Sequence, residues 1–286
     1  MRTYNLKQFY QASGLLLLVV MSTTACNIVS SPGSFDSPLY VANSTSDSIT
    51  VYAPFTNGDQ APSRFIRGAN TLLASPSGVA VNAAGETFIA NSSTGSITVY
   101  SLGANGNATP IRIISGVLTL LDNPQGAALD AACNLYVANA GAITSSITVY
   151  APGAGGAPGT PATNVAPIRT ISGSGTGLDN PIGVGLDTAG NLYVANAGIT
   201  TSSITVYAPA ANDNVPPSNT ITGTSTGLAS PQGVVLDPTG RLYVANKTTP
   251  SITVYTPGAM GNAIPIRTIT GGTTQLSQPL FIALRP

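Results

Sequence analysis

Short apolar segments, separated by turns rich in Gly, Asn, Asp, Ser and Pro, fill the chain from residue 39 to residue 284. β-Branched and aromatic residues dominate these segments, which predicts that each is a β-strand. Neither face of a segment is strongly polar, as expected for sheets that are covered on both sides. Four kinds of segment recur in a constant order about every fifty residues, so the chain is predicted to repeat one four-stranded unit.

Each kind of segment has its own consensus. The first, Pro-x-Gly-Val-x-Leu-Asp, begins at Pro76, Pro124, Pro181 and Pro231, and a shorter copy begins at Pro279. The second, Leu-Tyr-Val-Ala-Asn and its variants, occupies residues 39–43, 87–91, 135–139, 192–196 and 242–246. The third, Ser-Ile-Thr-Val-Tyr, begins at Ser48, Ser96, Ser146, Ser203 and Ser251. The fourth carries Arg64, Arg112, Arg169 and Arg267 and is the most polar, which favours an outermost position where charge discourages edge-to-edge pairing.

Four short strands per unit, repeated radially, are typical of a β-propeller. Each kind of strand occurs five times, but the chain enters at Leu39 with the second kind and leaves at 279–284 with the first. The last strand should therefore complete the first blade. We predict that residues 39–286 form an all-β, five-bladed propeller of four-stranded blades closed by the C-terminal strand, with six blades as the alternative.

Turn residues support the strand assignment. Asp187–Gly190 and Asp237–Gly240 each join two strands with Asp at the first position and Gly where a positive φ is needed. Cys133 replaces that Gly in the turn that begins at Asp130, so this turn is expected to be the most strained. The Gly- and Pro-rich insert 151–165 is expected to be a surface loop.

The stretch from Pro181 to Asn196 resembles the NHL repeat of β-propellers, and the resemblance extends over residues 39–284. Asn196 stands where the NHL pattern commonly has Asp, which is a departure. Members of that family are often six-bladed, whereas the five copies of each kind of strand in this chain predict five blades. The resemblance implies the fold and says little about activity.

The N-terminus has the organisation of a secretory signal. Arg2 and Lys7 precede the apolar run 15–21, and small residues lead to Cys26. This order resembles a bacterial lipoprotein signal, although Thr23 stands where Leu is usual. The resemblance implies that residues 1–25 are removed, that Cys26 is lipidated, and that residues 26–38 form a flexible tether. Ordinary secretion after cleavage at the same bond is the alternative.

Composition excludes several functions. Eight Lys and Arg and ten Asp and Glu follow residue 26, a net charge of −2, so no basic surface for nucleic acid is expected. The chain has no His, which excludes a Ser-His-Asp triad and a His-ligated metal. We expect no metal and no cofactor. Charged residues are only 7% of the chain, a composition typical of extracytoplasmic β-proteins.

Three rings of repeated residues are candidate sites, each with a structural alternative. The first ring comprises Asn43, Asn91, Asn139, Asn196 and Asn246, which end the second strands on the face of the Pro-x-Gly loops. These amides could bind a polar ligand, or they could satisfy backbone groups in tight turns, which is the more common role. The second ring, Asp130, Asp187 and Asp237, could hold Ca²⁺, but such residues normally cap their own turns. The third, Tyr52, Tyr100, Tyr150, Tyr207 and Tyr255, could stack on sugars but is more typical of packing between blades.

These observations favour a monomeric binding or scaffold module in the bacterial cell envelope, anchored by lipid and facing the periplasm or the exterior. Its expected partner is a polar ligand, a glycan or an envelope protein. The alternative is an extracytoplasmic lyase or lactonase that acts at the channel mouth, since the repeats distantly resemble the virginiamycin B lyase and gluconolactonase types. Those enzymes rely on His or on clustered acidic metal ligands, so the sequence favours a binding role over an enzymatic one.

Overall fold

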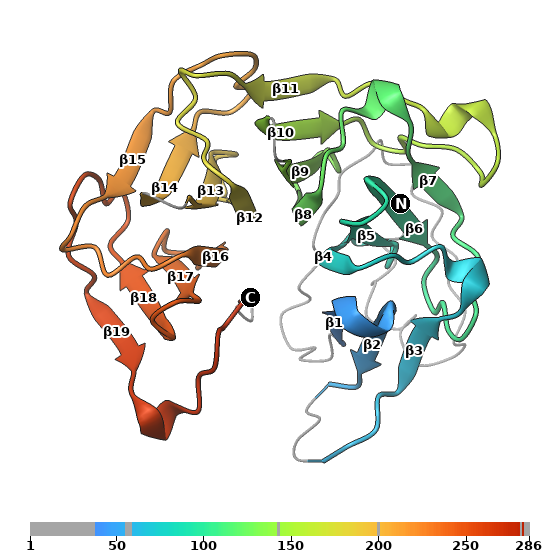
Figure 1. Ribbon diagram of the computed structural model, residues 1–286, viewed down its shortest axis with the longest axis horizontal. Coiled ribbons are helices and arrows are strands. Elements are labelled where there is room, and N and C mark those ends of the chain that lie inside the picture. The colour runs from blue at the N-terminus through green and yellow to red at the C-terminus, as the bar shows by residue number, and fades with distance from the viewer. Residues whose placement is uncertain (1–37, 55–58, 142–143, 199–200, 281, 283–286) are drawn as a thin grey trace, which may run out of the picture.

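Five antiparallel β-sheets stand around a central axis in the computed structural model, which describes residues 38–54, 59–141, 144–198, 201–280 and 282 (Figure 1). This arrangement confirms the five-bladed propeller that the repeats predict. The signal, the lipid-attachment residue Cys26 and the tether lie outside the described residues, apart from Pro38. No helix in the described part of the chain is long and apolar enough to cross a membrane.

The strands coincide with the repeated segments. Blade 1 contains β1 (Leu39–Asn43), β2 (Ser48–Tyr52) and β3 (Arg64–Arg67). Blade 2 contains β4 (Pro76–Val81), β5 (Thr87–Asn91), β6 (Ser96–Tyr100) and β7 (Arg112–Ile114). Blade 3 contains β8 (Pro124–Leu129), β9 (Leu135–Ala140), β10 (Ser145–Tyr150) and β11 (Arg169–Ser172). Blade 4 contains β12 (Pro181–Leu186), β13 (Leu192–Ala197), β14 (Ser202–Tyr207) and β15 (Asn219–Thr222). Blade 5 contains β16 (Pro231–Leu236), β17 (Leu242–Asn246), β18 (Ser251–Tyr255) and β19 (Arg267–Thr270).

Strand order within the blades places the Pro-x-Gly strand at the centre and the Arg-containing strand at the rim, as predicted from polarity. Short 3-10 helices connect some of the strands: η2 (Ser44–Ser46), η3 (Ala69–Thr71), η4 (Val117–Thr119), η5 (Pro161–Thr163) and η6 (Gly272–Thr274). The insert 151–165 includes η5, so this surface segment contains one turn of regular structure. Cys133 has a φ of 63°, which confirms that the third blade accepts a non-Gly residue in the left-handed region.

Hydrophobic cores lie between neighbouring blades. Each core combines an Ile from the third strand of one blade with a Tyr from the next, and the core between blades 1 and 2 contains Ile49, Ile66 and Tyr100. The Tyr100 side chain is fully buried, and its hydroxyl donates to the Thr71 carbonyl at 2.5 Å. Burial raises the pKa of Tyr100 to about 12. The repeated Tyr therefore packs between blades in blades 2 to 5, which confirms the structural alternative for this ring.

The first blade has three strands among the described residues. Half of the predicted closing strand, 279–284, lies outside them, and the described Pro279, Leu280 and Ile282 are not in a strand. Leu280 and Ile282 nevertheless line the same central cavity as β1. The described part of the C-terminal segment thus lies beside β1, and Figure 1 shows the chain running from β19 toward the centre of the ring.

The channel mouth as candidate functional site

A β-bulge at each Pro-x-Gly motif builds the mouth of the central channel. In blade 4, Pro181 pairs with Asn196 and Gly183 pairs with Ala195, so Ile182 is the extra residue on the inner strand. The same irregularity follows Pro76, Pro124 and Pro231. A bulge changes the direction of a side chain and is frequent next to functional sites. The residue x of each motif is therefore the one aimed at the mouth.

The residues x of all five motifs line one cavity of about 550 Å³ at the mouth: Ser77, Gln125, Ile182, Gln232 and Leu280. Blades 2 to 5 thus each contribute one side chain from a structurally equivalent bulge, and the C-terminal segment contributes Leu280. Loop residues of blades 1, 2 and 5 complete the wall, namely Ser44, Thr45, Asp47, Ser75, Ser92 and Lys247. The wall is mostly polar and uncharged, with two aliphatic side chains facing it.

Hydrogen bonds fix the amides of the two glutamines. The Gln125 Nε2 donates to Asn123 Oδ1 at 2.8 Å, and the Gln232 Nε2 donates to the Ser230 Oγ at 3.2 Å. Because the amide nitrogens are held by their own loops, the amide oxygens are left to accept hydrogen bonds from a ligand. The Ser77 hydroxyl likewise donates to the Pro124 carbonyl at 2.9 Å, which leaves its oxygen as an acceptor.

Two charged residues face the same cavity from opposite sides of the junction between blades 5 and 1. Asp47 in blade 1 accepts the Ser75 N–H at 2.6 Å, so this carboxylate partly serves the backbone. Lys247 in blade 5 follows the repeated Asn, where the other blades have Ser or Ala, and it is the only lysine after Lys7. Lys247 is therefore the cation of the mouth.

The predicted ring of asparagines lies beneath this wall. Asn91, Asn139, Asn196 and Asn246 are completely buried, and Asn43 is partly buried. In blade 3, the Asn139 Nδ2 donates to Thr148 Oγ1 at 3.0 Å, and its Oδ1 accepts the Asp122 N–H at 3.3 Å. The other three buried copies make both bonds, and Asn43 makes the equivalent Nδ2 bond to Thr50 Oγ1. The four buried amides satisfy the backbone of the turns that carry the mouth, and in this structure these four offer no surface to a ligand.

The mouth leads into a narrower, apolar channel of about 460 Å³. Its wall consists of the inner strands, including Gly78, Gly126 and Gly183 with Val79 and Val184. Because the glycines have no side chains, neighbouring inner strands approach closely there. The polar groups that could recognise a ligand are consequently concentrated at the mouth.

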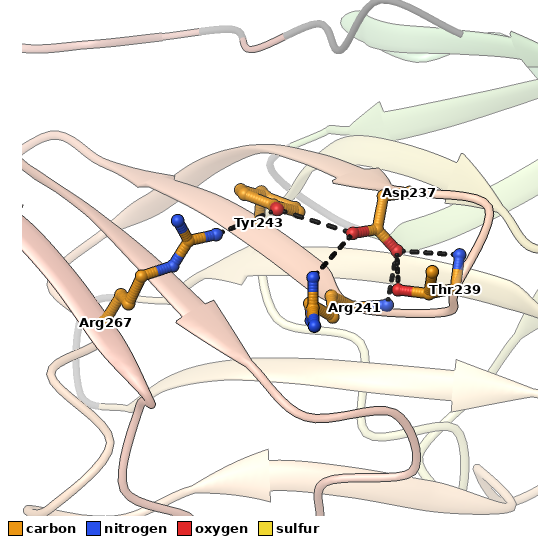
Figure 2. A network of polar contacts seen from close by, with 5 residues as sticks. All are labelled: Asp237, Thr239, Arg241, Tyr243 and Arg267. Atoms are coloured by element: carbon orange, nitrogen blue, oxygen red, sulfur yellow. Dashed lines mark hydrogen bonds and ion pairs between the residues drawn. The ribbon is translucent and has the colours of Figure 1, made fainter.

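The predicted ring of aspartates lies in hairpin turns of the repeats and caps them. The Asp237 Oδ1 accepts the N–H groups of Thr239 at 2.9 Å and Arg241 at 3.0 Å, and also the Thr239 hydroxyl (Figure 2). The Thr239 hydroxyl and these N–H groups hold the pKa of Asp237 below its ordinary value. Asp130 and Asp187 accept the corresponding bonds. This confirms the structural alternative for the ring.

Figure 2 also shows that the turn is tied to the rim of the blade. The Tyr243 hydroxyl donates to the Asp237 Oδ2 at 3.4 Å and accepts from the Arg267 guanidinium at 3.0 Å. A metal would compete with these partners for the carboxylate. Within the described residues, no three or more His, Cys, Asp or Glu side chains come together as a metal site.

Comparison with solved structures supports the propeller fold. A protein of unknown function from Bacteroides caccae has a TM-score of 0.57 at 14% identity over 83% of this chain and 73% of its own. Virginiamycin B lyase from Staphylococcus aureus has a TM-score of 0.56 at 11% identity over 87% of this chain and 71% of its own. No protein-family model matches the chain, and no curated protein sequence matches it. At these identities the similarity is one of fold alone.

The comparison gives no basis for transferring the lyase activity. A variant of the staphylococcal lyase in which one histidine is replaced by alanine is described as catalytically inactive, in a structure with quinupristin. This chain contains no His. The chemistry of the mouth must therefore be argued from the residues that line it.

Residues that line the mouth were missed from the sequence because they occupy the variable position of the motif. Pro and Gly are constant in four copies of Pro-x-Gly, whereas x changes from Ser to Gln to Ile. The constant positions are the more conspicuous candidates in the sequence, although in a repeat protein they mostly build the scaffold. Variability at x, next to a constant Gly, was the available signal.

Proposed function

We propose that the protein is a non-catalytic binding module whose channel mouth takes a short, hydroxyl-rich glycan. The ring of five x residues is the observation that carries this proposal. It provides amide oxygens from Gln125 and Gln232 and a hydroxyl oxygen from Ser77. It also provides aliphatic side chains from Ile182 and Leu280. A cavity of about this volume is typical of a binding site for a small ligand.

The hydrogen-bond inventory of the mouth favours hydroxyl donors on the ligand. Gln125, Gln232 and Ser77 already donate their protons to the protein, so each can accept a further bond. Ile182 and Leu280 can contact the C–H face of a sugar ring. Lys247 adds a cation, which favours an acidic sugar over a neutral one when both fit.

Titration of the purified mature domain with neutral and uronic-acid-containing oligosaccharides tests this function by calorimetry. We expect the Gln125→Leu and Gln232→Leu variants each to bind up to about tenfold more weakly, because one hydrogen bond is lost. Lys247→Ala should weaken binding of the acidic sugars only. Gln60→Leu is the matched control, since Gln60 lies in the loop between β2 and β3 and does not line the mouth.

Binding that both glutamine variants leave unchanged would contradict the mouth as the site. Turnover of an ester or lactone by the wild-type domain would favour the lyase or lactonase alternative. Among the described residues that line the mouth, only Asp47 and Lys247 could transfer a proton in such a reaction. Loss of turnover in the Asp47→Asn and Lys247→Ala variants would then replace the binding proposal.

The proposal includes a location at the cell envelope, through lipid on Cys26. The charged N-terminus, the apolar run and the small residues before Cys26 support it. We expect Cys26→Ser to move the protein from the membrane fraction to the soluble fraction, because its acyl chains are lost. The mass of the wild-type mature protein should include acyl groups. An unmodified Cys26, for example one joined to Cys133 in a disulfide, would contradict the anchor.

A further inference from the structure

Four of the five junctions between blades are held by the same pair of hydrogen bonds. In the first bond, a Tyr hydroxyl donates to the carbonyl of a Thr in the turn that leaves the preceding blade. The pairs are Tyr100 with Thr71, Tyr150 with Thr119, Tyr207 with Thr176 and Tyr255 with Thr226. All four Tyr side chains are fully buried, as are the four Thr residues.

In the second bond, an Asn side chain from the loop before the outer strand caps the same turn. Its Oδ1 accepts a backbone N–H at 2.7 to 2.8 Å. The pairs are Asn107 with Asn70, Asn164 with Leu118, Asn214 with Gly175 and Asn262 with Ser225. Together the two bonds fasten the outer half of each blade to its neighbour.

The turn that leaves blade 5 has the same shape but lacks these partners. Gly271 has a φ of 108°, close to the 115° of Gly173, and the Thr274 hydroxyl donates to its carbonyl at 2.7 Å, as in the other copies. By position in the repeat, the partners would come from blade 1: Tyr52 for the hydroxyl and Asp59 for the Asn. Asp59 retains the acceptor oxygen, so the substitution preserves the cap.

Apolar surface at this junction is correspondingly uncovered. Ile66, Ile114, Ile171 and Ile221 on the outer strands are each 1% exposed, whereas the equivalent Ile269 on β19 is 51% exposed. On the other side, Leu39 is 56% exposed, whereas its counterparts Leu135, Leu192 and Leu242 are 2% exposed. Figure 1 shows the interruption of the ring between β19 and the first blade.

We propose that the rim of blade 5 is an interaction surface for blade 1 of the same chain. The Tyr52 hydroxyl binds the Thr274 carbonyl, and the Asp59 carboxylate caps the Thr273 N–H, forming a clasp that closes the ring. Closure buries Ile269 as its four counterparts are buried. The clasp is distinct from the predicted inner strand at 279–284, because it joins the rims of the blades.

Repeat geometry favours blade 1 of the same chain, and not a second copy of the chain, as the partner of the blade 5 rim. The two halves of the clasp are already placed at the ends of one ring, so closure needs no second molecule and its entropic cost is small. A head-to-tail contact between copies would leave the same two surfaces free at its ends and would continue into an open assembly. The remaining four junctions show that these residues fit one another within a chain.

Thermal unfolding of the full mature chain provides the first test, with Tyr100→Phe as the matched control. Each variant loses one hydroxyl group and keeps the aromatic ring of the side chain. We expect Tyr52→Phe and Tyr100→Phe each to lower the Tm by about 2–4 °C. A Tyr52→Phe protein that melts with the wild type, while Tyr100→Phe melts earlier, would overturn the clasp.

Amide hydrogen exchange at Thr273 provides the second test. It reports local opening at this residue and not only global unfolding of the protein. We expect protection in the wild type and about tenfold faster exchange in Asp59→Ala. Asp59→Asn should retain the protection, since Asn fills this position at the other junctions. Unprotected exchange at Thr273 in the wild type would overturn the proposal. So would a dimer by light scattering that Tyr52→Phe converts to monomer, because the surface would then bind a second copy.

Discussion

Truncation after Gln278 should leave a chain that is insoluble or largely unfolded. The inner edge of blade 1 would then have no fourth strand, and Leu39 is already 56% exposed there. Residues 279–284 carry Leu280, Phe281, Ile282 and Leu284, each worth about 1.5–3 kcal/mol when buried. The upper limit of about 6–12 kcal/mol is comparable with the entire stability of a domain, about 5–15 kcal/mol.

Circular dichroism during heating measures this effect on the soluble fraction. Truncation after Leu284 is the matched control, since it removes only Arg285 and Pro286 and keeps the apolar residues. This shorter truncation should melt with the full chain. If the chain that ends at Gln278 also melts cooperatively near the wild-type temperature, the C-terminal strand does not close the ring.

Much of the fold could be predicted from the repeats because each copy carries the same signals. The polarity of the Arg-containing segment identified the outermost strand, and the buried Tyr ring followed from its position at the end of an apolar strand. The Asp at each hairpin was correctly expected to cap its own turn. These features depend on local sequence, so one copy predicts the others.

The candidate site could not be predicted because it depends on strand register. A bulge between Pro181 and Gly183 displaces Ile182 from the alternation of the strand, and consensus patterns do not reveal this shift. The burial of the repeated asparagine side chains could not be predicted for a related reason. The sequence predicts that the asparagines lie on the face of the Pro-x-Gly loops, but only the structure shows that Asn139 pairs with Pro124 and accepts the Asp122 N–H.

The junction between blades 5 and 1 differs from the others although its residues match. Its two sides come from opposite ends of the chain, so no local connection brings them together, unlike blades joined by a short turn. The contacts at this junction therefore join residues far apart in the sequence. They must form between the two ends of a ring whose other junctions are already assembled. This makes the clasp and the C-terminal strand the parts of the fold that local patterns specify least.

The close approach of the inner strands determines the width of the channel below the mouth. A Cβ on Gly183 would lie well inside the van der Waals distance of the Gln232 backbone carbonyl. Gly78 and Gly126 face the next blade in the same way. Because the obstacle is backbone, no rotamer change can relieve it, and the strands of blades 4 and 5 would have to separate.

We therefore expect Gly183→Ala to destabilise the protein by about 3 kcal/mol, which corresponds to a fall in Tm of about 6–12 °C. Gly185→Ala, on the same strand, is the matched control. Its added Cβ would lie 3.1 Å from the Val234 carbonyl, and the equivalent residues Ala80, Ala128 and Val235 already carry side chains. Thermal unfolding should show little change for Gly185→Ala. Equal melting of the two variants would mean that the inner strands can separate freely, and that channel width is not set by backbone contact.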